Sequence, residues 1–150
     1  MKAVSMTIGE SGNHEGFETA ATEVYSALKE YLEQYCPQGN LKLWITGYSR
    51  AAALSDVLAV KIISNGEVEV SQKDLFVYAF EPPASVSSDI ANNEDYTCIH
   101  NIYVESDIVP SIAPAIESAD YGLSRPGVDL KMDVTVDGLE AGIHPGRWLH

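Results

Sequence analysis

The sequence predicts a single α/β domain built on a mostly parallel sheet that is flanked by helices. Three short apolar runs, at residues 43–46, 75–80 and 98–104, have the length and composition of strands. Helical segments or long connections separate these runs, and such connections join parallel strands. The chain has 150 residues, of which 45% are hydrophobic, and no linker divides it. This is enough for one sizeable core.

The N-terminal part is expected to form a short edge strand, a loop and one long helix. Residues 2–8 fit an edge strand, and residues 9–16 are polar and rich in glycine, as in a loop. Between Phe17 and Tyr35, apolar residues recur at steps of three and four, while glutamates mostly take the other face. This pattern predicts a helix that packs on the sheet, with its tyrosines in the core or at its boundary. The segment 36–40 (CPQGN) ends the helix.

Residues 43–59 (LWITGYSRAAALSDVLA) predict a strand, a sharp turn and a helix, with Ser49 at the apex of the turn. This is the layout of a nucleophile elbow, in which a strained turn presents a reactive serine. Gly47 and Ala51 are small where the strand and the helix must approach each other. The backbone N–H of Arg50 lies at the positive end of the helix, where it can donate to a developing oxyanion. The segment therefore predicts a serine nucleophile and one oxyanion donor side by side.

Two further strands bring an acidic residue to the same edge of the sheet as Ser49. Residues 75–80 (LFVYAF) form a nearly continuous apolar run, typical of a strand buried on both faces. Residues 98–104 (CIHNIYV) form another, and Asp107 follows shortly after it. Functional groups gather at the C-terminal ends of parallel strands, so we expect Ser49 and Asp107 to lie there. Residues 127–136 alternate polar and apolar side chains, which fits a last strand or a hairpin arm that closes the sheet.

Four motifs follow one another along the chain. Residues 14–17 (HEGF) open the expected long helix, residues 45–54 (ITGYSRAAAL) form the elbow, residues 80–83 (FEPP) form a turn, and residues 101–110 (NIYVESDIVP) hold the expected acid. In this order they resemble the motifs of the class 3 lipase family, the fungal-lipase-like branch of the α/β-hydrolases, over roughly residues 13–126. The resemblance implies an α/β-hydrolase-like fold, hydrolysis of carboxylic esters, and a small-molecule ester or lipid as substrate. No cofactor is expected, because no cluster of His, Cys and Asp has ligand spacing.

The resemblance also implies Ser49 as the nucleophile and Asp107 as the acid of a catalytic triad. The local sequence supports Asp107, because the apolar residues Ile-Val-Pro that follow it can anchor its loop. Asp89 and Asp95 instead lie in a polar stretch that we expect to be solvated. In the triad, Asp107 would accept the imidazole N–H and stabilise the imidazolium that forms during attack.

Four histidines are candidates for the base. His14 belongs to the helix-opening motif and His100 lies inside an expected strand, so both are expected to be structural. His144 and His150 follow Asp107, and His144 is followed by Pro-Gly-Arg-Trp-Leu, which resembles the tail of the family. His150 is the last residue, where chain ends usually fray. We therefore expect His144 to be the base.

Composition excludes several other classes of function. The net charge of −13, with nine lysines and arginines, argues against nucleic acid and anionic membrane surfaces as partners. No apolar run has the length of a transmembrane segment, and residues 1–12 lack the apolar core of a signal peptide, so we expect a soluble chain whose compartment the sequence leaves open. Cys36 and Cys98 lack metal-ligand and CxxC spacing, so two idle or buried thiols are favoured over a disulfide. No cluster of His, Cys and Asp has metal-ligand spacing.

Departures from the family pattern affect the expected activity. Ala51 replaces a glycine of the elbow, and Arg50 places a long cation beside the nucleophile, where it narrows the pocket, attracts an acidic substrate or pairs with a surface carboxylate. Nothing before His14 resembles the family segment that supplies the second oxyanion donor. We therefore expect either a fragment of a longer hydrolase or a family core shortened at its N-terminus. Shortening would expose a sheet edge, which favours a homo-oligomer.

Two functions follow from these observations. The first is a serine ester hydrolase, slowed by the missing oxyanion donor and better suited to short or soluble esters than to emulsified fat, because no lid is recognised. The second is a non-catalytic, truncated hydrolase-like module that binds a partner or an apolar ligand. The order of serine, aspartate and histidine favours the first function, and the missing oxyanion segment favours the second.

Overall fold

The computed structural model describes residues 12–36, 41–110 and 122–133. The helices are α1 (Glu15–Tyr35), α2 (Arg50–Asn65) and α3 (Ser88–Ala91), and short 3-10 helices span Gln72–Asp74 and Glu94–Tyr96. The strands are β1 (Leu43–Tyr48), β2 (Leu75–Phe80), β3 (Val86–Ser87), β4 (Ile99–Val104), β5 (Leu123–Ser124) and β6 (Val128–Met132).

Four strands form one parallel sheet in the order β1-β2-β4-β6. Its register pairs Tyr48 with Phe80 and Phe80 with Ile102, so the C-terminal ends of β1, β2 and β4 lie side by side. Strands β3 and β5 form a separate antiparallel pair. The predicted α/β class is confirmed. For residues 127–136, a strand is confirmed over residues 128–132, where β6 runs parallel to β4, and residues 134–136 lie outside the described residues.

The expected long helix is confirmed as α1. Its N-terminus is capped by His14, whose Nδ1 accepts a hydrogen bond from the amide of Gly16 at 3.2 Å. Tyr25 is buried in the core, whereas Tyr31 and Tyr35 are exposed. The expected edge strand at residues 2–8 lies outside the described residues.

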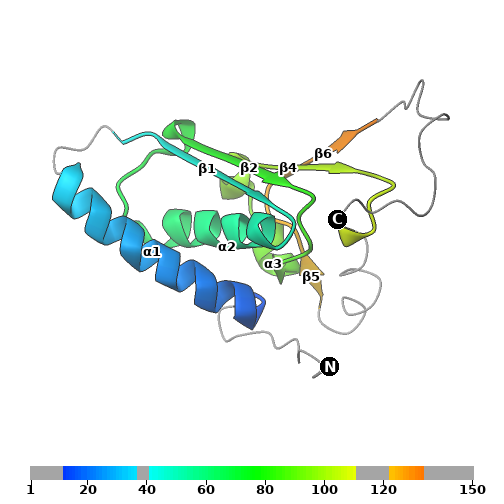
Figure 1. The fold of residues 1–150 in the computed structure, drawn as a ribbon, viewed down its shortest axis with the longest axis horizontal. Coiled ribbons are helices and arrows are strands. Elements are labelled where there is room, and N and C mark those ends of the chain that lie inside the picture. The colour runs from blue at the N-terminus through cyan, green and yellow to red at the C-terminus, as the bar shows by residue number, and fades with distance from the viewer. Residues whose placement is uncertain (1–11, 37–40, 111–121, 134–150) are drawn as a thin grey trace, which may run out of the picture.

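Both long helices lie on one face of the sheet, below the strands in the view of Figure 1. Helix α2 packs directly on β1 and β2, and α1 packs on α2. The core between them contains Val57 from α2, Val77 from β2 and Ile99 from β4, all fully buried. This arrangement buries alternate residues of β2 and the first half of β4, as the two-residue period of a strand requires, whereas every residue of β6 is exposed.

The opposite side of the sheet, which we call the open face, is apolar but lacks a covering helix among the described residues. Trp44 on β1 is 74% exposed and Leu130 on β6 is 43% exposed. The prediction that residues 75–80 are buried on both faces is wrong here, because Phe80 is exposed while Val77, on the other face, is buried. Strand alternation and register assign to the open face Trp44, Thr46, Tyr48, Phe76, Tyr78, Phe80, His100, Ile102, Val104, Val128, Leu130 and Met132.

Candidate active site

Ser49 occupies the turn between β1 and α2, as predicted. Its φ of 56° and ψ of −122° lie outside the regions that a residue with a side chain normally adopts. Hydrogen bonds hold this conformation: the amide of Ser49 donates to the carbonyl of Phe80 at 2.8 Å, and its carbonyl accepts from the amide of Ala52 at 2.9 Å. A strained residue persists only where its surroundings fix it, and such residues cluster at functional sites.

The close approach that brings strand and helix together at Ser49 depends on Gly47. A Cβ atom built on Gly47 would lie 2.3 Å from the carbonyl oxygen of Ala51. Because that atom belongs to the backbone of α2, a rotamer change cannot relieve the clash. The small residue expected at this position must therefore be a glycine, because the turn leaves no room for a Cβ atom.

The N-terminus of α2 presents an amide beside the serine hydroxyl. The first amides of a helix have no intrahelical acceptor, and that of Arg50 comes immediately after Ser49. The Ser49 side chain makes no capping hydrogen bond to the helix, so it does not compete for these amides. The Arg50 side chain is exposed. This end of α2 is suited to an anionic oxygen, because amides and the helix dipole both point there.

Asp107 lies in the turn that follows β4, at the same edge of the sheet as Ser49. Its amide donates to the carbonyl of Val104 at 3.0 Å, and its Oδ1 accepts from the amide of Val109 at 2.8 Å. A carboxylate held through one oxygen keeps the other for a further donor. Because β2 separates β1 from β4, the strand ends next to Ser49 and Asp107 lie two strand spacings apart, roughly 10 Å. An imidazole between them could contact both.

Glu81 also supports this edge of the sheet, a role that was not expected from the sequence. It has a positive φ of 52° and is buried, and its amide donates to the carbonyl of Ile102 at 2.8 Å. Its Oε1 accepts from the amide of Val104 at 3.0 Å. Glu81 therefore ties the end of β2 to the start of the loop that carries Asp107. A glutamate directly before two prolines was the only available signal in the sequence.

Asp56 is a second residue without an assigned role, in the second turn of α2. It is fully buried, and neither carboxylate oxygen has a hydrogen-bond partner among the described residues. Burial raises the pKa of Asp56 well above its ordinary value, Arg125 partly opposes that shift, and Asp129 adds to it. The signal in the sequence was a carboxylate in the apolar run ALSDVLAV.

The structure describes two of the four candidate histidines. His14 is buried at the start of α1, and His100 lies within β4 with its ring 5.3 Å from that of Tyr78. Both fit the structural role expected of them. His144 and His150 lie outside the described residues, so His144 as the base stays a prediction.

Other expectations concern residues away from the elbow. Asp89 and Asp95 are exposed, as predicted. Cys36 and Cys98 are both free thiols, and Cys36 is exposed rather than buried. Within residues 12–36, 41–110 and 122–133, no group of three or more His, Cys, Asp or Glu side chains is arranged to hold a metal ion. No helix in that part of the chain combines the length and apolarity needed to cross a membrane.

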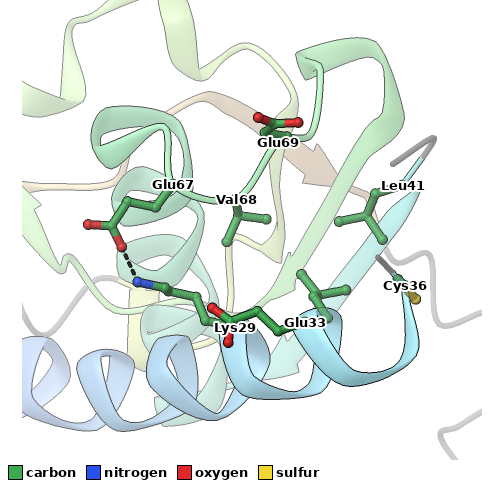
Figure 2. A pocket seen from close by; sticks show the side chains of 8 residues that line it. Lys29, Glu33, Cys36, Leu41, Glu67, Val68 and Glu69 are labelled. Atoms are coloured by element: carbon green, nitrogen blue, oxygen red, sulfur yellow. Dashed lines mark hydrogen bonds and ion pairs between the residues drawn. The ribbon is translucent and has the colours of Figure 1, made fainter. Parts of the chain in front are cut away.

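A hollow of about 210 Å³ lies at the opposite end of the sheet from Ser49, near the end of α1. Figure 2 shows its lining, in which Lys29 and Glu67 form an ion pair. Leu41, just before β1, borders it, so the hollow lies near the N-terminal ends of the strands. Neither Ser49 nor Asp107 borders it, and it is therefore not the candidate active site. Its lining consists of Lys29, Leu32, Glu33, Cys36, Leu41, Glu67, Val68 and Glu69.

The family model for lipase (class 3) matches residues 3–117. The chain belongs to the class 3 lipase family. This match confirms the family that the four motifs indicated. A comparison with curated proteins found no match.

Solved structures agree on the fold. Mono- and diacylglycerol lipase from Aspergillus oryzae has a TM-score of 0.69 and 18% identity, over 87% of this chain and 48% of its own. Rhizomucor miehei triacylglyceride lipase has a TM-score of 0.60 and 25% identity, over 79% and 44%. A triacylglycerol lipase whose catalytic centre is formed by a serine protease triad has a TM-score of 0.60 and 26% identity, over 79% and 44%. The α/β-hydrolase fold is therefore confirmed, and the chain spans less than half the length of these lipases.

Proposed function

We propose that this chain is a serine ester hydrolase that acts on carboxylic esters through Ser49, Asp107 and His144. The observation that carries the proposal is the strained conformation of Ser49 at the N-terminus of α2, with φ of 56°, in a member of the class 3 lipase family. A hydroxyl at this point is accessible, and the adjacent amide N–H of Arg50 can donate a hydrogen bond to an oxyanion.

The proposed reaction has two halves. Ser49 Oγ attacks the ester carbonyl carbon and its proton passes to His144, while the carbonyl oxygen becomes an oxyanion that accepts the amide N–H of Arg50. Asp107 accepts the other imidazole N–H and stabilises the imidazolium. The C–O bond then breaks, His144 returns the proton to the leaving alcohol, and an acyl-serine remains. Water attacks this ester by the same route and releases the acid.

The rate depends on how many donors face the oxyanion. Removing one donor typically slows such enzymes by about a hundredfold to a thousandfold. Arg50 supplies one amide in this proposal, so we expect slow turnover, with short or soluble esters favoured over emulsified fat.

A second function, a hydrolase-like module that binds without catalysis, is favoured by one observation. The open face of the sheet presents Trp44, Tyr48 and Leu130 to solvent in the described part of the chain. Exposed apolar surfaces of this kind often mark interaction sites. In this alternative, Ser49 keeps its conformation for structural reasons alone.

Labelling with a fluorophosphonate separates the two functions. We expect intact mass and peptide mapping to find the probe on Ser49, and we expect Ser49→Ala and His144→Ala to abolish it. Ser26→Ala is the matched control, because Ser26 is an exposed serine on α1, away from the elbow. Absence of labelling in folded protein, checked by circular dichroism, would contradict the hydrolase and favour the binding module.

A further inference from the structure

The loop that carries Asp107 is held at both ends. Its first end is fixed where the amide of Asp107 donates to the carbonyl of Val104. At its far end, the carbonyl of Pro110 accepts a hydrogen bond of 3.0 Å from Nη1 of Arg125. Arg125 lies between β5 and β6, so a residue distant in the sequence reaches back to this loop.

The guanidinium of Arg125 is itself fixed by two neighbouring strands. Its Nε and Nη2 donate to the two carboxylate oxygens of Asp129 on β6, at 3.1 and 2.6 Å. Its central carbon lies 4.9 Å from the ring centroid of Tyr103 on β4. Each nitrogen of the guanidinium therefore donates a hydrogen bond: Nε and Nη2 to Asp129, and Nη1 to Pro110. Lysine cannot reproduce this planar arrangement.

The backbone that follows Arg125 is also held against β4. Buried Asn101 donates its side-chain N–H to the carbonyl of Pro126 at 2.7 Å. Gly127 has a φ of 85°, and a Cβ atom there would lie 2.4 Å from the carbonyl oxygen of Ile99. Only glycine allows this approach. The Arg125 side chain therefore projects from a rigid backbone toward the loop.

The charge of Arg125 acts on the helix of the nucleophile as well. Burial would lower the pKa of Arg125, but the hydrogen bond and charge of Asp129 outweigh it, so the pKa lies above its ordinary value. The positive charge of Arg125 also opposes the effect of burial on the pKa of Asp56 in α2. An ordinary surface ion pair would not explain a side chain that is only 14% exposed and contacts two strands and a loop.

We propose that Arg125 is a positioning residue for catalysis, which holds the loop of Asp107 so that its carboxylate faces the catalytic histidine. This inference rests on the proposed function. A structural role alone would change how much protein folds, whereas a positioning role changes the reactivity of each folded molecule. The two can therefore be measured separately.

The first measurement is amide hydrogen exchange, which needs no activity. In the unchanged protein, we expect the amides of Asp107 and Val109 to be protected, because both donate inside the loop. Arg125→Lys and Arg125→Gln should accelerate exchange in residues 105–110 but not in β2. Asp74→Asn is the matched control, because it breaks the ion pair with Lys42, 3.0 Å long, at the other end of the sheet.

The second measurement is the rate of fluorophosphonate labelling of the folded fraction. Displacing a catalytic group by about 1 Å can cost up to a hundredfold, so we expect kinact to fall by about tenfold to a hundredfold in Arg125→Gln, with KI unchanged. In Arg125→Lys, kinact should fall less, because lysine keeps the positive charge. Asp129→Asn keeps the arginine and its hydrogen bond to Pro110. Its kinact should therefore fall less than that of Arg125→Gln.

The outcomes are distinguishable. If the unchanged protein is not labelled, the proposed function fails, and hydrogen exchange still tests whether Arg125 fixes the loop. Labelling of the unchanged protein, with folded Arg125 variants that react as fast and exchange as slowly, would overturn the positioning role. Should Arg125→Gln fail to fold, Arg125→Lys and Asp129→Asn carry the test. Rapid exchange of Val109 in the unchanged protein would overturn it without any variant.

Discussion

The two faces of the parallel sheet are built from the same strands but have different surroundings. On one face, Val77 and Ile99 are fully buried beneath α2. On the open face, Trp44, Phe80 and Leu130 are exposed in the described part of the chain. Parallel sheets are usually covered on both sides, whereas the described residues cover one side of this sheet with helices. It shows that the apolarity of a strand does not reveal which of its faces is covered.

The candidate site lies at the edge that the two faces share. Ser49 and Asp107 follow the C-terminal ends of β1 and β4, and their conformations depend on main-chain hydrogen bonds at that edge. Support comes from the covered side, where α2 begins at the serine and contains Asp56. The open-face residues Phe80 and Val104 contribute only main-chain carbonyls to the elbow and the loop, and none of the contacts described there uses an open-face side chain. Changes on the two faces should therefore have unequal consequences.

The largest effect is expected from truncating the covered face. Ile99→Ala should lower the free energy of unfolding by about 2–5 kcal/mol, because it leaves a cavity in a fully packed core. The matched variant is Ile102→Ala, on the same strand but on the open face and only partly buried. It should cost less than half as much. Urea denaturation of both variants measures the difference, and equal losses would contradict the comparison.

The next effect is a gain in stability from Asp56→Asn on the covered side. Because burial raises the pKa of Asp56 in the folded state, the folded protein holds a proton that the unfolded chain releases at a lower pH. Stability therefore falls as pH rises from the unfolded pKa to the folded one. Each unit of that shift is worth ~1.4 kcal/mol. Asparagine has no proton to lose, so the variant should be more stable at pH 7.

Denaturation across a pH series checks this sign. The difference between Asp56→Asn and the unchanged protein should be small near pH 4 and should grow toward neutral pH. Asp89→Asn is the control, because that carboxylate is exposed. A constant difference at every pH would show that the gain does not come from titration of Asp56.

Much of the fold could be predicted because its signals are local. The run at residues 75–80 matches β2, and the elbow around Ser49 follows from small residues between an apolar strand and a helix. Strands β3 and β5 were missed, since two residues are too few to show alternation. Part of the candidate site could also be predicted. Ser49 and Asp107 lie in short motifs, so the sequence was enough to place them at the strand ends.

Contacts between distant segments were not accessible in this way. Arg125 pairs with Asp129 four residues away, which a sequence shows, but its bond to Pro110 exists only after β6 has joined the sheet beside β4. The role of Glu81 likewise depends on β2 and β4 being neighbours. The apolar character of the open-face residues can be seen in the sequence. Their exposure cannot, because it depends on where the helices lie.

The smallest effect on stability is expected from polar substitutions on the open face. The double variant Trp44→Ser and Leu130→Ser should change the free energy of unfolding by less than about 1 kcal/mol, since both side chains are exposed. It should nevertheless weaken binding of the dye ANS and lower self-association in sedimentation, because it removes much of an exposed apolar patch. Tyr31→Ser, on an exposed part of α1, is the control and should leave dye binding unchanged. A large loss of stability in the double variant would show that the open face is covered in the folded protein.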